Sequence, residues 1–147
     1  NLIENKNMTL SAAESLTGGL FQEEVTSIAG VSKWFKGGIV SYLPEIKENV
    51  LGVKKKTVEN FGVVSSQCAK EMAENVRKLM DTDIGISFTG VAGPTSLEGK
   101  EPGTVYIGVS IKDKPTITRL VMLPGNRESV RVRAVKTGAW YILKELR

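Results

Sequence analysis

The amino-acid sequence predicts a three-layer α/β/α domain built on a mixed β-sheet. Over the first two thirds of the chain, short apolar segments alternate with segments of helical periodicity, as in parallel strands joined by crossover helices. After residue 103, two strand-like segments follow each other directly, which adds an antiparallel pair to the sheet. The 147 residues contain no repeat or linker, so we expect residues 1–147 to form a single domain.

The first part of the chain predicts two strands and the helices that follow them. Residues 1–7 have the pattern of a helix end, and residues 8–13 predict the first strand. From Leu16 to about residue 30, apolar residues recur at helical spacing. Residues 37–43 predict the second strand, and Pro44 suits the first turn of the next helix because that turn needs no N–H from it.

Two further helices precede the third strand. Residues 54–62 predict a short helix, and the clearest helix of the chain follows an N-cap at Ser65 or Ser66. Its apolar side chains form one stripe, which predicts a face buried against the sheet. Because Cys68 belongs to this stripe, we interpret it as a core residue. The stripe consists of Cys68, Ala69, Met72, Ala73, Val76, Leu79 and Met80.

The last part of the chain predicts three strands and one long helix. Residues 83–88 have the composition of a buried strand, and residues 89–103 are too rich in Gly and Pro for regular structure. Residues 104–111 and 116–123 predict an antiparallel hairpin. A long helix then follows to the end of the chain, with Asn126 as its N-cap.

Histidine is absent from the chain, and this excludes several classes of site. A Ser-His-Asp or Cys-His catalytic arrangement cannot form within it, nor can a metal centre with imidazole ligands. A general base must therefore be Lys, Tyr, Asp, Glu or a water molecule. The single cysteine excludes an intramolecular disulfide and a multi-thiolate zinc site. We expect neither a metal nor a cofactor.

The chain carries a modest positive charge. It has 20 Lys and Arg against 16 Asp and Glu, a net charge of +4, and the basic residues are spread along the sequence. This is compatible with a small anionic ligand and too weak to predict nucleic-acid binding. No apolar segment approaches the roughly 20 residues that cross a bilayer, and no signal-peptide pattern is present. We expect a cytoplasmic protein that does not bind membranes.

Two loops with glycine and hydroxyl residues follow predicted strands. In sheets with parallel strands, ligands bind beyond the carboxyl ends of the strands, and glycine lets the backbone approach an anion closely. Neither loop has the spacing of a P-loop or of a dinucleotide-binding loop. Tight turns need glycine in any case, so a purely structural role remains open. The residues concerned are Ser15, Thr17, Gly18 and Gly19 in the first loop and Thr89, Gly90, Gly93 and Pro94 in the second.

Tyr42 and Lys47 are the candidate partners of a reactive Ser15. If the second strand ends beside the Ser15 turn, a phenol and an amine can both face the serine hydroxyl. A lysine acts as a base near neutral pH when it is desolvated, and a tyrosine can relay a proton or donate to an oxyanion. The alternative is a solvated lysine and a tyrosine that only packs.

Arg127 and Arg131 are four residues apart at the start of the last predicted helix. Cations in a first helical turn oppose the helix dipole, and a bound anion would offset that cost. The alternative is a pair of solvated arginines on an exposed face.

Five segments of the chain, in order, also match a known family. They are "AAESLTGGLFQEEVTSIAGVSKWFKGGIVSYLPEIKENVLGV", "GVVSSQCAKEMA", "ISFTGVAGP", "PGTVYIGV" and "PGNRESVR". In combination they resemble the CinA C-terminal domain family, which includes the competence/damage-inducible protein CinA and nicotinamide-nucleotide amidase. The resemblance extends from about Thr9 to Arg133.

The resemblance implies hydrolysis of the carboxamide of nicotinamide mononucleotide (NMN) to nicotinic acid mononucleotide and ammonia, in pyridine-nucleotide salvage. It also implies an α/β/α fold, commonly a homodimer, with no metal needed for the amide step. The family's nucleophile corresponds to Ser15, and its tyrosine and lysine to Tyr42 and Lys47. The arginine of its last helix corresponds to Arg127, which we expect to hold the 5′-phosphate. The family's second loop corresponds to Thr89, Gly90, Ala92, Gly93 and Pro94.

Some features leave alternatives open. The chain has Leu16 where family members often have cysteine, and Thr95 and Ser96 where a Gly-Gly pair is usual. Larger members carry a preceding pyrophosphatase-like domain, and whether one belongs here stays open. We expect the amides of the Thr17–Gly19 turn to hold an oxyanion, with those of the Thr89 loop as further candidates. The alternative function is a catalytically silent nucleotide-binding or regulatory module.

Overall fold

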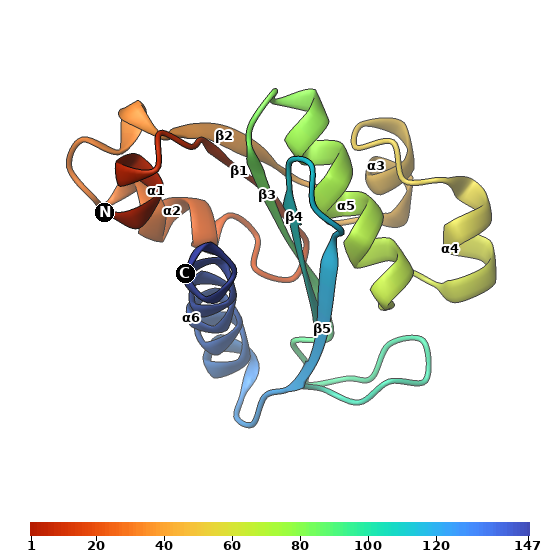
Figure 1. Cartoon of the computed structure of the whole chain (residues 1–147). Coiled ribbons are helices and arrows are strands. Elements are labelled where there is room, and N and C mark those ends of the chain that lie inside the picture. The colour runs from red at the N-terminus through yellow and green to blue at the C-terminus, as the bar shows by residue number, and fades with distance from the viewer.

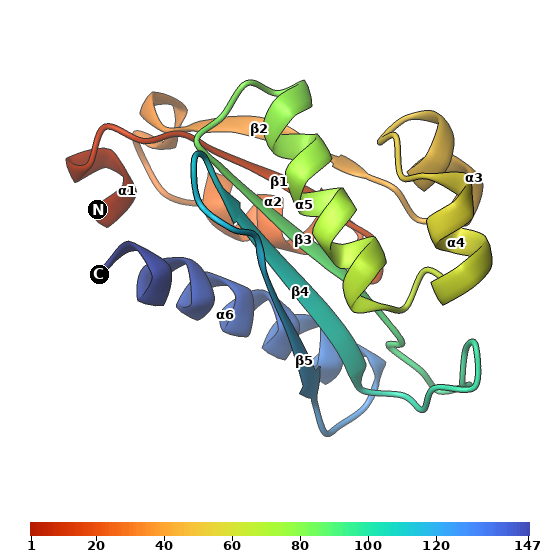
Figure 2. The same cartoon turned by 45° about the vertical axis from the view of Figure 1, so that its right-hand side comes forward.

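The computed structural model describes residues 1–147 and has a five-stranded mixed sheet with helices on both faces (Figures 1 and 2), which confirms the predicted fold class. The strands are β1 (Leu10–Glu14), β2 (Phe35–Val40), β3 (Ile84–Gly90), β4 (Thr104–Ile111) and β5 (Ile117–Met122). The helices are α1 (Leu2–Asn5), α2 (Leu20–Thr26), α3 (Pro44–Asn49), α4 (Lys55–Phe61), α5 (Ser66–Leu79) and α6 (Arg127–Leu146), with a 3₁₀ turn at Val31–Lys33.

The strand order β2-β1-β3-β4-β5 brings three chain segments to one edge of the sheet. Strand β1 pairs in parallel with both β2 and β3, whereas β4 is antiparallel to β3 and to β5. The carboxyl ends of β1, β2 and β3 therefore point the same way. The segments that follow Glu14, Val40 and Gly90 consequently lie together, which is the common position for a ligand site in such sheets.

Each face of the sheet has its own core. Helices α1, α2 and α6 cover one face and α5 the other, with α3 and α4 beside α5 (Figures 1 and 2). Strand β3 supplies Ile84, Ile86 and Phe88, at alternate positions, to a cluster of 20 buried residues on the α2–α6 side. A second cluster of 9 buried residues lies on the α5 side and includes Cys68, so the predicted core position of this cysteine is confirmed.

Small residues let α5 lie close to the sheet. The Ser87 hydroxyl on β3 donates to the Ala69 carbonyl of α5 at 2.6 Å. A Cβ at Gly108 of β4 would lie 2.6 Å from the same carbonyl oxygen, so no larger residue fits there without moving the helix.

Most predicted boundaries lie within two residues of those in the structure, and the larger differences concern the segment after β1 and the second strand. The helix expected from Leu16 begins at Leu20, because residues up to Gly19 form a turn in which Gly18 (φ +58°) and Gly19 (φ +103°) have left-handed backbone conformations. The second strand ends at Val40 rather than at residue 43, so Tyr42 lies in the following loop. None of the helices combines the length and the hydrophobicity needed to cross a membrane.

Candidate active site

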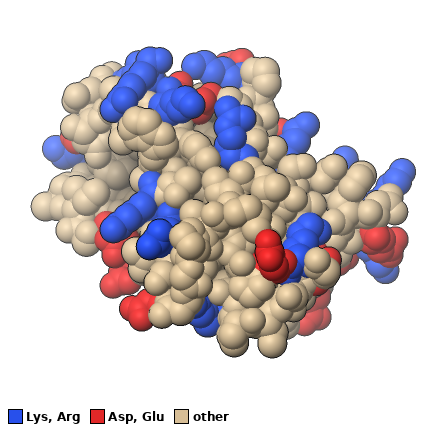
Figure 3. Space-filling view, turned by 90° about the horizontal axis from the view of Figure 1, so that it is seen from below, with Lys and Arg blue, Asp and Glu red and all other residues tan.

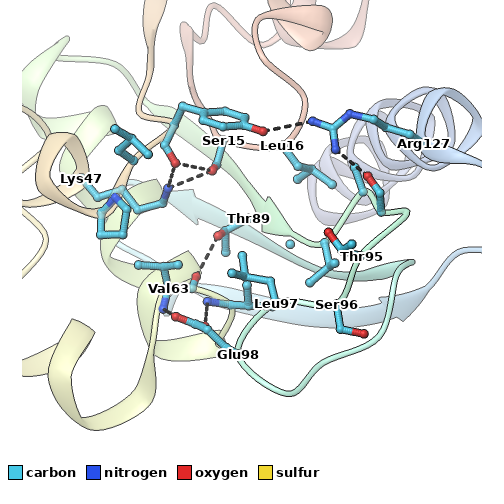
Figure 4. A pocket seen from close by; sticks show the side chains of 18 residues that line it. Ser15, Leu16, Lys47, Val63, Thr89, Thr95, Ser96, Leu97, Glu98 and Arg127 are labelled. Carbon is cyan, nitrogen blue, oxygen red and sulfur yellow. Dashed lines mark hydrogen bonds between the residues drawn. The ribbon is translucent and has the colours of Figure 1, made fainter.

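A cavity of about 360 Å³ opens at the carboxyl ends of β1 and β3. Its walls come from the turn after β1, the start of α3, the α4–α5 connection, the loop after β3 and the first residue of α6 (Figure 4). Eight of the candidate residues selected from the sequence line it. These are Ser15, Tyr42, Lys47, Thr89, Gly90, Ala92, Gly93 and Arg127.

Ser15 follows β1 directly and is fixed by the sheet. Its amide donates to the Phe88 carbonyl of β3 at 3.0 Å, which continues the parallel ladder by one residue. Its side chain faces the cavity and lies close to Lys47 (Figure 4), with 2.8 Å between Ser15 Oγ and Lys47 Nζ. The serine hydroxyl therefore has an amine as its nearest polar neighbour.

Lys47 lies on α3 and is fully buried. Its ammonium donates to the Ser41 carbonyl at 2.6 Å, to the Tyr42 carbonyl at 3.1 Å and to Ser15 Oγ. Desolvation lowers the Lys47 pKa from 10.5 to about 8, and the weaker influences of Cys68 and Glu98 raise it.

These three contacts suit a neutral amine as well as an ammonium. In the neutral form, two N–H groups can remain on the two carbonyls while the lone pair faces the Ser15 hydroxyl. The arrangement can therefore accept the serine proton without any movement of the lysine.

Tyr42 is oriented differently from the sequence-based expectation. Its carbonyl, not its phenol, contacts Lys47, and the same carbonyl lies 3.4 Å from Ser15 Oγ. The phenol oxygen instead accepts a hydrogen bond from Arg127 Nη2 at 3.0 Å, and the side chain is exposed. This corrects the expectation that the phenol and the amine both face the serine oxygen. The reason is that β2 ends two residues before Tyr42.

Arg127 is the first residue of α6 and spans the cavity wall. Besides Tyr42, its guanidinium donates through Nη1 to the Gly93 carbonyl at 2.6 Å. It thus joins α6 to the loops after β2 and β3. The residue is exposed, as the alternative of a solvated arginine expected, but its guanidinium is also held by these two hydrogen bonds.

The Thr17–Gly19 turn lies outside the cavity, contrary to its expected role in binding substrate. The fully buried Glu14 carboxylate accepts the Gly19 amide at 3.2 Å and, at the start of α2, the amides of Phe21 and Gln22 at 2.9 and 3.0 Å. A side chain thus already occupies the place that a bound anion would take. The hydroxyl of Thr17 is buried without a hydrogen-bond partner in the chain.

Arg131 holds the other side of this turn. Its guanidinium donates to the carbonyls of Leu16 and Thr17, both at 3.0 Å. Arg131 and Glu14 therefore fix the backbone on either side of Ser15. Sequence analysis did not assign these roles, although an acid just before a predicted helix is a usable signal because it complements the helix dipole.

Several backbone amides at the cavity remain without partners. The amide of Leu16, the residue after Ser15, donates no hydrogen bond within the chain, and neither do those of Ala92 and Gly93. The Thr89 hydroxyl is not free, because it donates to the Val63 carbonyl at 2.7 Å. The free backbone N–H groups of Leu16, Ala92 and Gly93 are donors of the kind that can stabilise a developing oxyanion.

Charged side chains elsewhere form no continuous basic surface on the face shown in Figure 3. Lys and Arg occur there in several groups, with Asp and Glu among them. No group of three or more His, Cys, Asp or Glu side chains is arranged to hold a metal ion.

Comparison with known proteins agrees with this architecture. The profile of the CinA C-terminal domain matches residues 1–146. The chain belongs to the CinA C-terminal domain family. A competence-damage inducible protein of Bacillus cytotoxicus is 52% identical over 145 residues, which cover 99% of this chain and 35% of the relative. The chain thus spans about a third of the length of the curated relatives that it matches.

Solved structures of the CinA superfamily have the same fold. The protein from Enterobacter cloacae superposes with a TM-score of 0.96 at 30% identity, covering 99% of this chain and 86% of that one. The protein from Escherichia coli gives 0.93 at 29% identity, covering 96% and 82%.

Proposed function

We propose that this CinA-family domain is an amidohydrolase that acts on the carboxamide of NMN, releasing ammonia and nicotinic acid mononucleotide. One observation carries the proposal: a fully buried lysine with a pKa lowered to about 8 lies 2.8 Å from the hydroxyl of Ser15. A buried amine beside a serine is the activated nucleophile expected in a chain without histidine. The substrate itself rests on the family resemblance.

In the proposed acylation, Lys47 accepts the Ser15 proton as Oγ bonds to the carboxamide carbon. The resulting tetrahedral intermediate collapses when its C–N bond breaks, and the Lys47 ammonium supplies the proton with which ammonia leaves. A water molecule then attacks the acyl-enzyme, gives one proton to Lys47, and releases the carboxylic acid as Ser15 recovers its hydrogen. Lys47 thus acts alternately as base and acid, and Tyr42 is not needed as the immediate base.

The backbone around Ser15 suits stabilisation of the oxyanion. The Leu16 amide follows the nucleophile directly and has no partner in the chain, as is common for one donor of an oxyanion hole. The free amides of Ala92 and Gly93 are candidates for the second donor. One such donor is typically worth about 3 kcal/mol of transition-state stabilisation.

Arg127 is the proposed contact for the 5′-phosphate. It is one of two cations at the cavity, and Lys47, the other, is used in the chemistry. Through its bonds to Tyr42 and Gly93, Arg127 would couple phosphate binding to the position of both loops.

Incubation of the purified protein with NMN, followed by an ammonia assay, tests the proposal. We expect release by the wild type and none above background by Ser15→Ala, with NMN binding retained in the variant. Near-normal turnover by Ser15→Ala would contradict the covalent route. Binding of NMN without ammonia release by the wild type would favour a silent nucleotide-binding module instead.

A further inference from the structure

Glu98 is the single acidic side chain on the cavity wall. It lies in the loop after β3, whereas the two cationic side chains at the cavity are Lys47 and Arg127. A carboxylate is unexpected in a site that binds a phosphate-bearing ligand, because like charges repel. Its presence would suit a part of the ligand that is not anionic.

Backbone contacts fix the Glu98 carboxylate in place. Oε2 accepts the Val63 amide at 3.0 Å and Oε1 accepts the Val64 amide at 2.9 Å, just before the N-cap of α5 (Figure 4). Gly62 makes room for this approach: a Cβ there would lie 2.6 Å from Oε1, and its φ of +76° also favours glycine. Glu98 is an exposed residue, and these bonds hold its carboxylate in one position at the cavity wall.

The Glu98 charge acts on the reactive part of the cavity. Each carboxylate oxygen accepts one backbone bond and keeps a further lone pair, so the negative charge is not neutralised. Its negative charge is among the weaker influences that raise the Lys47 pKa, as expected for a carboxylate on the wall of the same cavity. The Val63 amide donates to Glu98, and the Val63 carbonyl accepts the Thr89 hydroxyl.

We propose that Glu98 is a specificity-determining residue that favours amides carried on a cationic ring, as in an oxidised nicotinamide nucleotide, over amides on a neutral ring. This inference rests on the proposed function. The pyridinium nitrogen of NMN has a permanent positive charge close to the carboxamide, and its phosphate is at the other end of the molecule. With the carboxamide at Ser15 and the phosphate at Arg127, the ring charge would meet the field of Glu98. A neutral ring would desolvate the carboxylate without compensation.

Binding of NMN and of its reduced form, NMNH, tests this directly. The two share the carboxamide, ribose and phosphate and differ in the ring, which is cationic in NMN and neutral in NMNH. Calorimetric titrations in a Ser15→Ala background prevent turnover. We expect NMN to bind about tenfold more tightly than NMNH, the size of effect that one partly screened charge pair provides. Adding Glu98→Gln should reduce this preference to less than about twofold.

Glu101→Gln is the matched control, because Glu101 is, like Glu98, an exposed acid of the same loop but does not line the cavity. It should leave the preference for NMN unchanged. If Glu98→Gln weakens both ligands equally, the residue only holds the loop, and the inference is wrong. A preference below twofold in the Ser15→Ala parent would also overturn it, independently of how Glu98→Gln folds.

The proposed function is checked separately by ammonia release from the wild type. Release together with an unchanged NMN preference in Glu98→Gln overturns only the role of Glu98. Absence of both NMN binding and ammonia release overturns the proposed function, and the role of Glu98 with it.

Discussion

Replacing Lys47 by methionine should change how stability depends on pH. The Lys47 pKa is lower in the folded protein than in the unfolded chain, so the unfolded chain holds this proton more tightly. Below pH 8 both states are protonated, and folding carries the full cost of burying the charge. As pH rises from about 8 to 10.5, the folded protein loses the proton first and this cost disappears. Wild-type stability therefore rises through this window relative to a variant with no amine.

The size of the effect follows from the pKa difference. At 1.36 kcal/mol per pKa unit, a lowering from 10.5 to about 8 corresponds to about 3 kcal/mol at neutral pH. By linkage, this cost to wild-type stability is about 1.4 kcal/mol smaller at pH 9 and about 2.5 kcal/mol smaller at pH 10. The variant also loses the Nζ hydrogen bonds to the Ser41 and Tyr42 carbonyls. That loss is nearly independent of pH. It therefore changes the difference in free energy of unfolding between the two proteins by the same amount at every pH.

Urea unfolding at pH 7, 9 and 10 measures this difference. Both proteins should carry Cys68→Ala, because burial raises the Cys68 pKa to about 12 and its thiol would otherwise titrate in the unfolded chain. We expect the free energy of unfolding of Lys47→Met, relative to its parent, to fall by about 2.5 kcal/mol between pH 7 and pH 10. A constant difference across this range would refute the reasoning, since it would mean that Lys47 keeps its ordinary pKa in the fold.

Three further predictions concern Arg127 at the cavity, Glu14 beneath the Ser15 turn and Cys68 in the core. Arg127→Met should raise the KM for NMN at least about tenfold through loss of a charged contact. Arg133→Met, an exposed change on the same helix, should leave the KM unchanged in the same ammonia assay. Glu14→Gln should lower the free energy of unfolding in urea by about 2 kcal/mol, because the charged acceptor of three amides is lost; an effect below about 0.5 kcal/mol would contradict this. The Cys68 thiol should not react with a thiol reagent at pH 8 until the protein is unfolded in urea, and rapid reaction of the native protein would argue against its burial.

The sequence was sufficient to predict the fold because the local sequence patterns mark the same helices and strands that the sheet topology requires. Helical spacing, the caps at Ser65 and Asn126 and the late hairpin each mark their elements, and the structure has them at those places. The parallel β1–β3 pair then follows from the alternation of strands and helices. The meeting of the Ser15 turn and the Thr89 loop at one edge is a consequence of that topology.

Contacts between distant segments were less predictable. Lys47 contacts the Ser15 turn and the loop after β2, and no pattern within α3 reveals these contacts. The bonds of Glu98 to Val63 and Val64 join residues about 35 positions apart, and nothing in the intervening sequence indicates them. The Tyr42 phenol was misplaced because a strand boundary was expected at residue 43, and a difference of three residues changes where that side chain points.

The Thr17–Gly19 turn was assigned to ligand binding because glycine and hydroxyl residues suit an anion site. The same composition also suits a turn whose amides are satisfied from within the chain, as Glu14 does here. The decisive residue lies only one position before Ser15. Local composition predicts the turn itself. It does not predict which group accepts hydrogen bonds from the backbone amides there.

The pH dependence of kcat/KM for ammonia release from NMN tests most directly whether a neutral Lys47 activates Ser15. Because the free enzyme must lose the Lys47 proton first, activity should fall tenfold per pH unit below a pKa of about 8 and level off above it. Lys47→Met should show no release above background at any pH. A flat profile between about pH 6.5 and 9.5, or normal turnover by Lys47→Met, would contradict the account.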